Sequence, residues 1–531
     1  MISIGIQKHH LSSVCVHEDG KLIYYNQEER ASKTKYAAFT PINSLKIIPT
    51  ITDKEVNNIY FTGYDYASNE NQSLSALVKS LGISEAEGIR WNEPRYGHHI
   101  PHAIKAFNDS GFDNALVVIS DGRGSTYDME EIVYEITTIY YMEKSKNPLI
   151  IYKNLHTKNI NLYNSSSLKF NYLCDISNKL QAGDLYIRAT IKCGFTGDDC
   201  GKLMGLAAYG KDNDKYKDKT YTIEELEALE IPEEDRADFA YVIQNTFENH
   251  YINNVEIAKA LKPECKNIVL SGGSSLNVVA NYKVQKRLNA EKYNLFVEPM
   301  CSDDGNSIGI AQYYLQAEHG YSFPKLESLY IVGQDPDYSN IKINDDESII
   351  DTTPEQIARL IEEGNIVCLY QGKAEAGPRA LGNRSILFDP RVVNGKDIVN
   401  KIKKRESFRP FACTIMHEHV SEYFDMAGLE ESPFMMYAVQ ALEGVDKIIP
   451  SVIHKDNTCR VQTLKEHQNK HYYELIKAFK EKTNIPILFN TSFNLAGETI
   501  VDTVEDAIDT LRRSELQYLY LPEIKKLITV L

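Results

Sequence analysis

A short run of glycines and arginines in the carboxy-terminal half has the composition of an anion-binding loop. It reads GPRALGNRS from Gly377, with Glu375 just before it. Arg379 and Arg384 can each present a planar fork of donors to phosphate or carboxylate oxygens. Gly377 and Gly382 allow the backbone to come close to the same ligand. The composition therefore predicts an anion site.

A second basic run follows this loop. It reads KKRESFRPFA and contains Lys403, Lys404, Arg405 and Arg409. An isolated run of this kind is more often a solvated surface than a binding site. Two basic runs close together in the chain favour a site for a phosphorylated ligand instead, because each cationic group can neutralise phosphate charge.

Histidines and carboxylates elsewhere have the composition of a metal site. His98 and His102 in the string HHIPH share one face if the segment is helical, with Pro101 in the first turn. Asp121 follows the apolar run ALVVIS, and Asp303 opens the acidic turn DDG. Two imidazoles and two carboxylates suit a divalent transition metal such as iron, manganese or zinc. The alternative from these residues alone is a chance pair of histidines.

A double glycine between an apolar run and a helical pattern indicates a nucleotide-binding turn. The string KNIVLSGGSSLNVVANYKV contains Gly272 and Gly273, and a helix is expected to begin at Ser274 or Ser275. Free N–H groups at such a helix start can bind phosphate or ribose. The same pattern also occurs as a simple tight turn. The chain has no Walker loop and no GxGxxG string, which disfavours the P-loop and Rossmann types of nucleotide binding.

Two strand-turn-strand patterns in the amino-terminal half indicate a duplicated α/β fold. The first runs from ISIGI through LSSVCV to KLIYY, with Asp19 and Gly20 as a hairpin turn. The second runs from ALVVIS through DGRGST to IVYEITTIYYMEK. Such a pair suggests a duplication of the actin and sugar-kinase type, in which paired turns face each other across a nucleotide cleft. Farther on, the helical pattern EQIARLIEEG and the strand IVCLY lead into the glycine-arginine loop.

Length and composition favour a large cytoplasmic enzyme. The chain has 531 residues, 43% of them hydrophobic, which is enough for several cores. The formal net charge of -16 argues against general binding of polyanions but permits a local basic cleft. The nine cysteines form no CxxC pair, which indicates free thiols in a reducing cytoplasm. We find no apolar signal-peptide core in MISIGIQKHH and no apolar run of membrane-spanning length, so a cytoplasmic location is expected.

Several longer strings carry a resemblance to a known family. They are GKLMGLAAYG from Gly201, LSGGSSLNVVAN from Leu270, DDGNSIG from Asp303, HKDNTCRVQT from His454 and FNTSFNLAGETIV from Phe489. Together with GPRALGNRS, and in this order, they resemble the O-carbamoyltransferase family of nodulation and antibiotic-tailoring enzymes. The resemblance spans nearly the whole chain.

The resemblance implies two domains and their ligands. Residues 1–340 would form an ATP- and metal-binding domain of the actin and sugar-kinase type, in which His98, His102, Asp121 and Asp303 hold the metal. Residues 333–348 would be a polar connector. Residues 350–531 would form a YrdC-like α/β domain that binds carbamoyl phosphate and makes carbamoyl-adenylate with ATP and Mg²⁺.

The resemblance also assigns roles to single residues. His10 would be a general base for the acceptor hydroxyl, although Leu11 stands where relatives carry the aspartate of an HDSS-like motif. Lys202 would contact phosphate. The nucleotide would be bound by Gly272, Gly273 and Asn277. Carbamoyl phosphate would be bound by Arg379, Arg384, Lys404, Arg409 and Arg460, with Asn490 and Asn494 as polar contacts.

The sequence leaves open the class of acceptor and one alternative function. The acceptor would be a hydroxyl on a small metabolite, or on a hydroxymethylated base such as 5-hydroxymethylcytosine in phage DNA. The main alternative is a nucleotide-binding regulatory protein that kept the fold and lost the transfer activity. The absence of CxxC pairs argues against a hydrogenase-maturation carbamoyltransferase, and the acidic balance disfavours threonylcarbamoyl transfer to transfer RNA.

Overall fold

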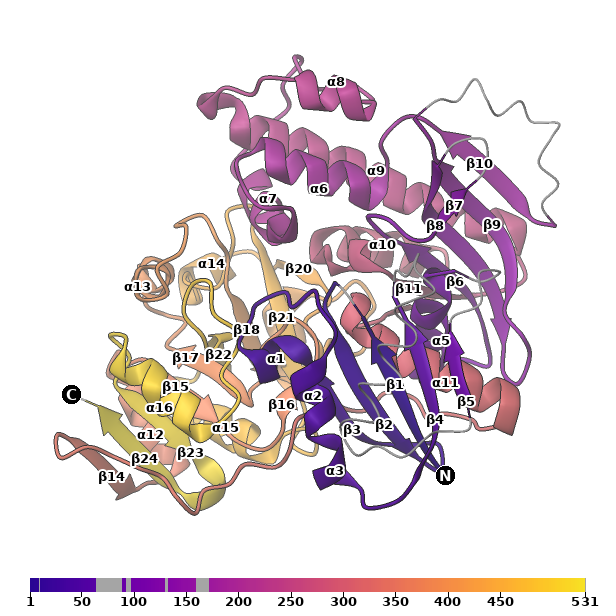
Figure 1. Ribbon diagram of the computed structural model, residues 1–531. Coiled ribbons are helices and arrows are strands. Elements are labelled where there is room, and N and C mark those ends of the chain that lie inside the picture. The colour runs from indigo at the N-terminus through magenta and orange to yellow at the C-terminus, as the bar shows by residue number, and fades with distance from the viewer. Residues whose placement is uncertain (9, 64–87, 92–96, 129–131, 159–170, 531) are drawn as a thin grey trace. The chain divides into compact units, whose positions relative to one another are not determined.

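The chain folds as two compact units in the computed structural model (Figure 1), which describes residues 1–8, 10–63, 88–91, 97–128, 132–158 and 171–530. The first unit comprises Met1–Glu28 and Tyr36–Leu326, and the second comprises Glu29–Lys35 and Glu327–Leu531. The division at Leu326 and Glu327 precedes the polar stretch 333–348. The second unit also contains β13 (Tyr330–Val332) and β14 (Glu347–Asp351).

The first sheet of the first unit contains the strand order β3-β2-β1-β4-β5. Neighbouring strands are antiparallel from β3 to β1 and parallel from β1 to β5. Asp19 and Gly20 have φ of 47° and 79° and form the tight turn between β2 and β3, as the sequence predicted. The bounds are β1 (Ile2–Gln7), β2 (Ser13–Glu18), β3 (Lys21–Gln27), β4 (Val56–Thr62) and β5 (Gly88–Trp91).

The second sheet repeats this arrangement with the order β9-β8-β6-β11-β12. Its strands are again antiparallel from β9 to β6 and parallel from β6 to β12. β10 lies beside β9, and the short β7 pairs with β8. This repetition confirms the internal duplication that the two strand-turn-strand patterns indicated. The bounds are β6 (Asn114–Ser120), β7 (Thr126–Asp128), β8 (Ile132–Glu143), β9 (Leu149–His156), β10 (Leu173–Ser177), β11 (Asn267–Ser271) and β12 (Asn294–Val297).

Two helices pack against each other and against the two sheets. α5 (His99–Ser110) contacts β6 and β11, and α11 (Asn306–His319) contacts β1 and β4. Gly309 makes the close helix contact possible, because a Cβ there would lie 2.1 Å from the carbonyl oxygen of Pro101. In the described part of this unit the other α-helices are α2 (Ile42–Lys46), α3 (Ile48–Ile51), α6 (Ala182–Lys192), α7 (Cys200–Ala207), α8 (Ile223–Ala228), α9 (Arg236–Leu261) and α10 (Val278–Ala290). α1 (Glu28–Ser32) begins at the last residue of the unit's first segment.

The second unit is built on a 10-stranded mixed sheet with the order β14-β24-β23-β15-β17-β22-β18-β21-β20-β19. β13 pairs separately with β16 (Ala374–Glu375). The bounds of the remaining strands are β15 (Val367–Tyr370), β17 (Arg384–Phe388), β18 (Ala412–Met416), β19 (Phe424–Asp425), β20 (Ala438–Ala441), β21 (Thr458–Leu464), β22 (Ile487–Ser492), β23 (Tyr518–Leu521) and β24 (Lys526–Val530).

Helices cover both faces of this sheet, as the alternation along β15 shows. Val367 and Leu369 pack with α12 (Pro354–Glu362) and α15 (Lys470–Thr483), whereas Cys368 and Tyr370 pack with α16 (Val504–Arg512). Thr353 starts α12 with a reciprocal capping box. The unit also contains α13 (Gly395–Ile402) and α14 (Val445–Ile448). Among the described residues of both units, no helix combines the length and the apolar composition that crossing a bilayer requires.

Candidate functional site

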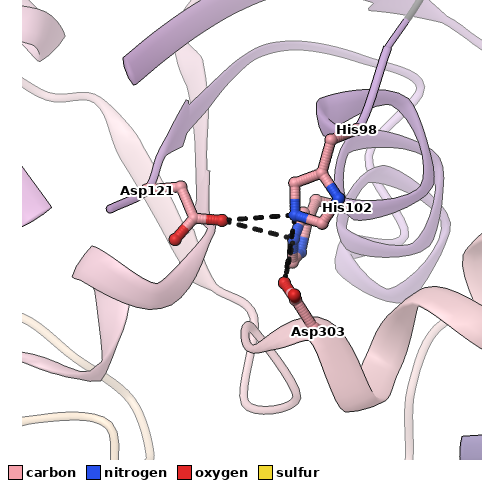
Figure 2. A group of neighbouring side chains, drawn as sticks. All are labelled: His98, His102, Asp121 and Asp303. Atoms are coloured by element: carbon pink, nitrogen blue, oxygen red, sulfur yellow. Dashed lines mark hydrogen bonds and ion pairs between the residues drawn. The ribbon is translucent and has the colours of Figure 1, made fainter. Parts of the chain in front are cut away.

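Four side chains of the first unit converge on one point (Figure 2). His98, His102, Asp121 and Asp303 each offer one ligand atom, and these atoms lie within 4.8 Å of one another. Nε2 of His98 and Nε2 of His102 lie 3.1 and 3.2 Å from the same atom, Oδ1 of Asp303. They lie 3.5 and 3.7 Å from Oδ2 of Asp121. The structure thus brings together the residues that the sequence selected as metal ligands.

Three elements deliver these side chains. His98 directly precedes α5 and His102 lies one turn along it, with Pro101 in the first turn. Asp121 directly follows the buried strand β6, and Asp303 begins the 3-10 turn that leads into α11. The group therefore lies where one strand ends and two helices begin, on backbone that packing holds in place.

The donor chemistry of the group fits a cation. Nε2 of His102 lies 3.1 Å from Nδ2 of Asn306 and 3.2 Å from Oδ1 of Asp303. A single imidazole nitrogen thus meets both an amide and a carboxylate, and either a proton or a cation can lie between it and the carboxylate. Imidazole and carboxylate ligands suit Zn²⁺, Fe²⁺ or Mn²⁺.

The four groups also shift one another's protonation. Burial lowers the pKa of His98, but the carboxylates of Asp303 and Asp121 raise it to well above its usual range. Burial raises the pKa of Asp303, but His98 and His102 bring it well below its usual range. The pKa of Asp121 is lowered for the same reason. The site thus keeps both carboxylates ionised, and the net potential favours a bound cation.

A buried charged network supports the backbone at His98. Oγ of Ser125 accepts a hydrogen bond from the backbone N–H of His98 at 2.6 Å, and the N–H of Ser125 donates to Oε2 of Glu135 at 3.2 Å. Glu135 is fully buried and forms an ion pair with Lys153 at 2.5 Å. Burial raises the pKa of Glu135, but His99 and Lys153 lower it to about 2. Burial lowers the pKa of His99 itself to about 4, so this imidazole is neutral near pH 7.

The double-glycine turn lies against Asp121. Gly272 has φ of 86°, and a Cβ there would lie 2.3 Å from the carbonyl oxygen of Ser120. A Cβ on Gly273 would lie 3.0 Å from Oδ1 of Asp121. Glycine at both positions therefore lets the turn come close to the four candidate metal ligands His98, His102, Asp121 and Asp303, here called the metal-type group.

The helix after this turn begins later than the sequence indicated. A 3-10 turn begins at Gly273 and ends at Leu276, and α10 begins at Val278 instead of at Ser274 or Ser275. Asn277 caps α10, because its Oδ1 accepts a hydrogen bond from the N–H of Ala280 at 3.1 Å. The expected nucleotide contact Asn277 is thus already engaged in holding the helix start.

His10 and Lys202 lie at other places in the first unit. His10 is exposed in the turn between β1 and β2, where its carbonyl oxygen accepts a hydrogen bond from Nε2 of Gln7 at 3.3 Å. Leu11 beside it has φ of 51°, a left-handed conformation that aspartate adopts more readily than leucine. Lys202 is half-buried on α7 and pairs with Asp199 at 3.1 Å.

In the second unit, the glycine-arginine loop connects β16 to β17. Glu375 at the end of β16 is fully buried, whereas Arg379 in the loop is half-buried. Gly382 has φ of 110°, and a Cβ there would lie 2.2 Å from the ring of Tyr472. The loop is therefore packed tightly against α15, and its second glycine is sterically required.

Arg384 has a different environment from the one that the sequence suggested. Its Nη1 donates to the carbonyl oxygens of Gln371 at 2.6 Å and Asn383 at 2.9 Å. Its Nη2 donates to the carbonyl oxygens of Gly372 at 3.0 Å and Asp502 at 3.3 Å. The side chain is 2% exposed. Because four backbone carbonyls accept hydrogen bonds from its two Nη atoms, this geometry favours a structural role over the expected contact with ligand.

A group of cationic side chains surrounds Arg460 on β21. Burial lowers the pKa of Arg460, and the charges of Arg379 and Arg405 lower it further, to well below its usual range. Burial and Arg409 lower the pKa of Arg405 to about 9. Glu406 lies 3.6 Å from Arg409 and offsets part of this charge. Because a guanidinium stays protonated in proteins, these shifts indicate a strong positive potential, which attracts anions.

Lys403, and not Lys404, is the buried lysine of the second basic run. Nζ of Lys403 donates to the carbonyl oxygen of Ser492 and to Oδ1 of Asn494, the latter at 3.1 Å. Burial and Arg405 lower the pKa of Lys403 to well below its usual range. Lys404 is exposed and has φ of 52°. The sequence indicated Lys404 as a ligand contact, because adjacent basic residues carry no signal that separates a buried lysine from an exposed one.

Asn490 and Arg460 lie in one row across neighbouring strands. Ala412 on β18 is paired with Asn490 on β22 and with Arg460 on β21, so all three side chains share a face of the sheet. Nδ2 of Asn490 donates to the carbonyl oxygen of Ala380 at 3.1 Å and to Thr414 at 3.0 Å. Asn490 therefore ties the glycine-arginine loop to the strand beside Arg460.

Both units contain regions that match models of known protein families. A family model described as Carbamoyltransferase N-terminus matches residues 223–312, and one described as Carbamoyltransferase C-terminus matches residues 358–526. Nodulation protein NolO of Bradyrhizobium diazoefficiens is 30% identical over 460 residues, covering 79% of this chain and 76% of NolO.

Two further proteins are similar over part of the chain. The 3'-hydroxymethylcephem-O-carbamoyltransferase of Amycolatopsis lactamdurans is 28% identical over 344 residues, covering 59% of this chain and 61% of that enzyme. Among solved structures, full-length HypF in its phosphate- and nucleotide-bound form superposes with a TM-score of 0.38 at 12% identity, covering 60% of this chain and 56% of HypF.

Proposed function

The chain belongs to the O-carbamoyltransferase family and is a transferase, and from this premise we propose that it makes carbamoyl-adenylate from carbamoyl phosphate and ATP and then carbamoylates an acceptor hydroxyl. Carbamoyl-adenylate would form in the second unit, which we assign to the YrdC type. Transfer to the acceptor would take place in the first unit, which we assign to the actin and sugar-kinase type. The duplicated sheets of the first unit support the latter assignment.

The observation that carries this proposal is the cationic group of the second unit. This group consists of Arg379, Arg405, Arg409 and Arg460. Burial, together with repulsion between these like charges, lowers the pKa values of Arg405 and Arg460. Folding brings these like charges together and partly buries them, which is unfavourable unless an anion offsets them. Two phosphorylated substrates, carbamoyl phosphate and ATP, supply that negative charge.

In the donor step, carbamoyl phosphate loses phosphate to water, and the resulting carbamate attacks the α-phosphate of ATP. The products are inorganic phosphate, carbamoyl-adenylate and pyrophosphate. Arg379 and Arg460 bind phosphate oxygens through paired N–H donors. Lys403 holds Asn494, a polar contact of the ligand, in place at the end of β22. Mg²⁺ accompanies ATP as its usual counter-ion.

In the transfer step, the hydroxyl of the acceptor attacks the carbamoyl carbon of the adenylate, and AMP leaves. The turn at Gly272 and Gly273 binds the nucleotide close to Asp121. His98, His102, Asp121 and Asp303 hold a divalent transition metal, which when bound neutralises charge on the departing phosphate. His10, which is exposed in the turn between β1 and β2, accepts the hydroxyl proton. Lys202 contacts a phosphate oxygen.

For the acceptor, we propose a hydroxyl on a small molecule, with the hydroxymethyl group of a modified DNA base as the competing class. The relative that is an O-carbamoyltransferase of hydroxymethylcephem supports the first class. The net charge of -16 also disfavours a polyanionic partner. A DNA acceptor would require a focused basic surface besides the group that binds carbamoyl phosphate, and its binding would weaken steeply with salt.

The donor step is tested by ATP–pyrophosphate exchange. Purified protein is incubated with ATP, Mg²⁺ and labelled pyrophosphate, with and without carbamoyl phosphate. We expect label in ATP only when carbamoyl phosphate is present. Exchange that ignores carbamoyl phosphate, or none at all, contradicts the proposal.

The acceptor class is tested in a preparation that has passed the exchange assay. The protein is incubated with ATP, Mg²⁺, carbamoyl phosphate and DNA that contains 5-hydroxymethylcytosine, and the DNA is digested to nucleosides for mass spectrometry. We expect no gain of a carbamoyl group on the nucleoside. A gain would establish the DNA base as the acceptor instead.

A further inference from the structure

Glu375 lies directly beneath the glycine-arginine loop, and one of its oxygens accepts three backbone N–H groups. Oε1 accepts from Leu381 at 2.7 Å, from Asn383 at 2.8 Å and from Arg384 at 3.1 Å. The side chain is 0% exposed. A single buried oxygen thus fixes the direction of three peptide groups in the segment that follows Arg379.

The carbonyl groups of the same segment are fixed as well. Neutral side chains from several strands donate to them, so the segment is restrained from both sides of each peptide bond. The donors are Asn490 to the oxygen of Ala380 at 3.1 Å, Tyr330 and Gln462 to that of Leu381 at 2.8 and 2.9 Å, and Gln371 to that of Gly382 at 2.8 Å.

A neutral acceptor would not replace the carboxylate in this role. A carboxylate oxygen accepts several N–H groups, and charged acceptors form bonds roughly twice as strong as neutral ones. Oε2 of Glu375 has no hydrogen-bond partner among the described residues, and leaving a buried oxygen unpaired is unfavourable for stability. An arrangement that is unfavourable for folding and yet orders a ligand-binding loop is typical of a functional site.

We propose that Glu375 is a positioning residue of the donor site, which holds the loop so that Arg379 meets the phosphate of carbamoyl phosphate without reorganisation. This inference rests on the donor function proposed above. Its physical basis is preorganisation: donors fixed before binding lose little conformational freedom when the anion arrives. Glu375 acts through the backbone of the loop and contacts no substrate itself.

Glu375→Gln tests the inference, because glutamine keeps the shape and removes the charge. We expect the affinity for inorganic phosphate, measured by calorimetry, to fall at least ~10-fold, with a matching rise in KM for carbamoyl phosphate in the exchange assay. KM for acceptor hydroxyl should not change. Amide hydrogen exchange of the peptide that contains Leu381, Asn383 and Arg384 should accelerate, whereas that of β22 should not.

Glu347→Gln is the matched control. Glu347 is a buried carboxylate of the same unit, on the edge strand β14 of the 10-stranded sheet, and it pairs with Arg512 at 2.6 Å. This variant should lose comparable stability and leave phosphate affinity, KM and loop exchange unchanged.

The outcomes separate this inference from the proposed function. Unchanged phosphate affinity in Glu375→Gln overturns the inference, even if the loop amides exchange faster, because the role would then be structural only. A wild-type protein that binds no phosphate overturns it as well. The wild type could show no carbamoyl-phosphate-dependent exchange while Glu375→Gln binds phosphate more weakly than the wild type. In that case the proposed function fails and the positioning role stands.

Discussion

The ammonium of Lys403 donates a hydrogen bond to Oδ1 of Asn494 at 3.1 Å, although 91 positions separate the two residues in the chain. The contact joins the end of α13 to the segment after β22. It connects the second basic run to the string FNTSFN. From the sequence these were two separate motifs, both expected to belong to one site. The pair therefore marks where the two motifs meet.

The first prediction compares two adjacent lysines. Lys403→Met should reduce carbamoyl-phosphate-dependent ATP–pyrophosphate exchange by about 10²-fold, because it removes the hydrogen bonds that hold Ser492 and Asn494 in place. Lys404→Met should have little effect, because Lys404 is exposed. The exchange rate of each variant at saturating ATP is the measurement. Equal losses in both variants would contradict the assignment of Lys403 to the site.

The second prediction separates the two arginines of the loop. Arg379→Ala should abolish the exchange and shift the unfolding midpoint by no more than ~2 °C, because its guanidinium serves the ligand. Arg379→Lys should restore little activity, since lysine lacks the forked donor geometry. Exposed Arg359→Ala on α12 is the control, and near-normal exchange in Arg379→Ala would contradict the assignment of the loop.

Arg384→Ala should instead destabilise the second unit by at least about 3 kcal/mol, because it leaves buried carbonyl oxygens without donors. Chemical denaturation monitored by circular dichroism measures this loss. A folded Arg384→Ala protein of normal stability that has lost the exchange would restore the ligand-binding role that the sequence suggested.

The sequence predicted the parts of this molecule that depend on local pattern. Alternating apolar residues with Asp19 and Gly20 between them specify a hairpin, and the structure has it. His98 and His102 share a helix face because their spacing is one turn. Asp121 was identified because it follows a strand whose residues are all apolar or small, which fixes where that strand ends.

The sequence could not predict which basic side chains point inward. α13 ends at Ile402, and the left-handed backbone at Lys404 turns the chain so that Lys403 is buried and Lys404 is exposed. Arg384 is the first residue of a buried strand, so its guanidinium meets backbone carbonyls from distant segments. Both outcomes depend on tertiary contacts, and neither residue type nor spacing encodes them.

The third prediction concerns the metal-type group. His102→Ala or Asp303→Asn should weaken the affinity for a transition metal by at least ~10-fold and stop carbamoyl transfer. The exchange reaction should continue, because it belongs to the second unit. Elemental analysis of protein purified without chelator measures the metal. His319→Ala, at an exposed position of α11, is the control, and undiminished metal content in both ligand variants would contradict the site.

The fourth prediction follows from a buried histidine on β2. His17 is 1% exposed and packs edge-on against Phe323, and burial lowers its pKa from 6.5 to about 4. The unfolded chain therefore binds the proton more readily than the folded one between these two values. Stability is fully present above the unfolded pKa and falls as the pH drops from about 6.5 toward about 4, by up to about 3 kcal/mol.

His17→Phe removes the titrating group and should flatten this part of the pH dependence. Urea unfolding of the wild type and the variant between pH 7 and pH 4.5 measures it, with the exposed His319→Phe as the control. We expect the free energy of unfolding of the wild type to fall by about 2 kcal/mol more than that of His17→Phe over this range, because the variant has no proton to bind at this position. Parallel pH profiles for the two proteins would mean that His17 protonates without cost in the folded state, and burial would then not control its charge.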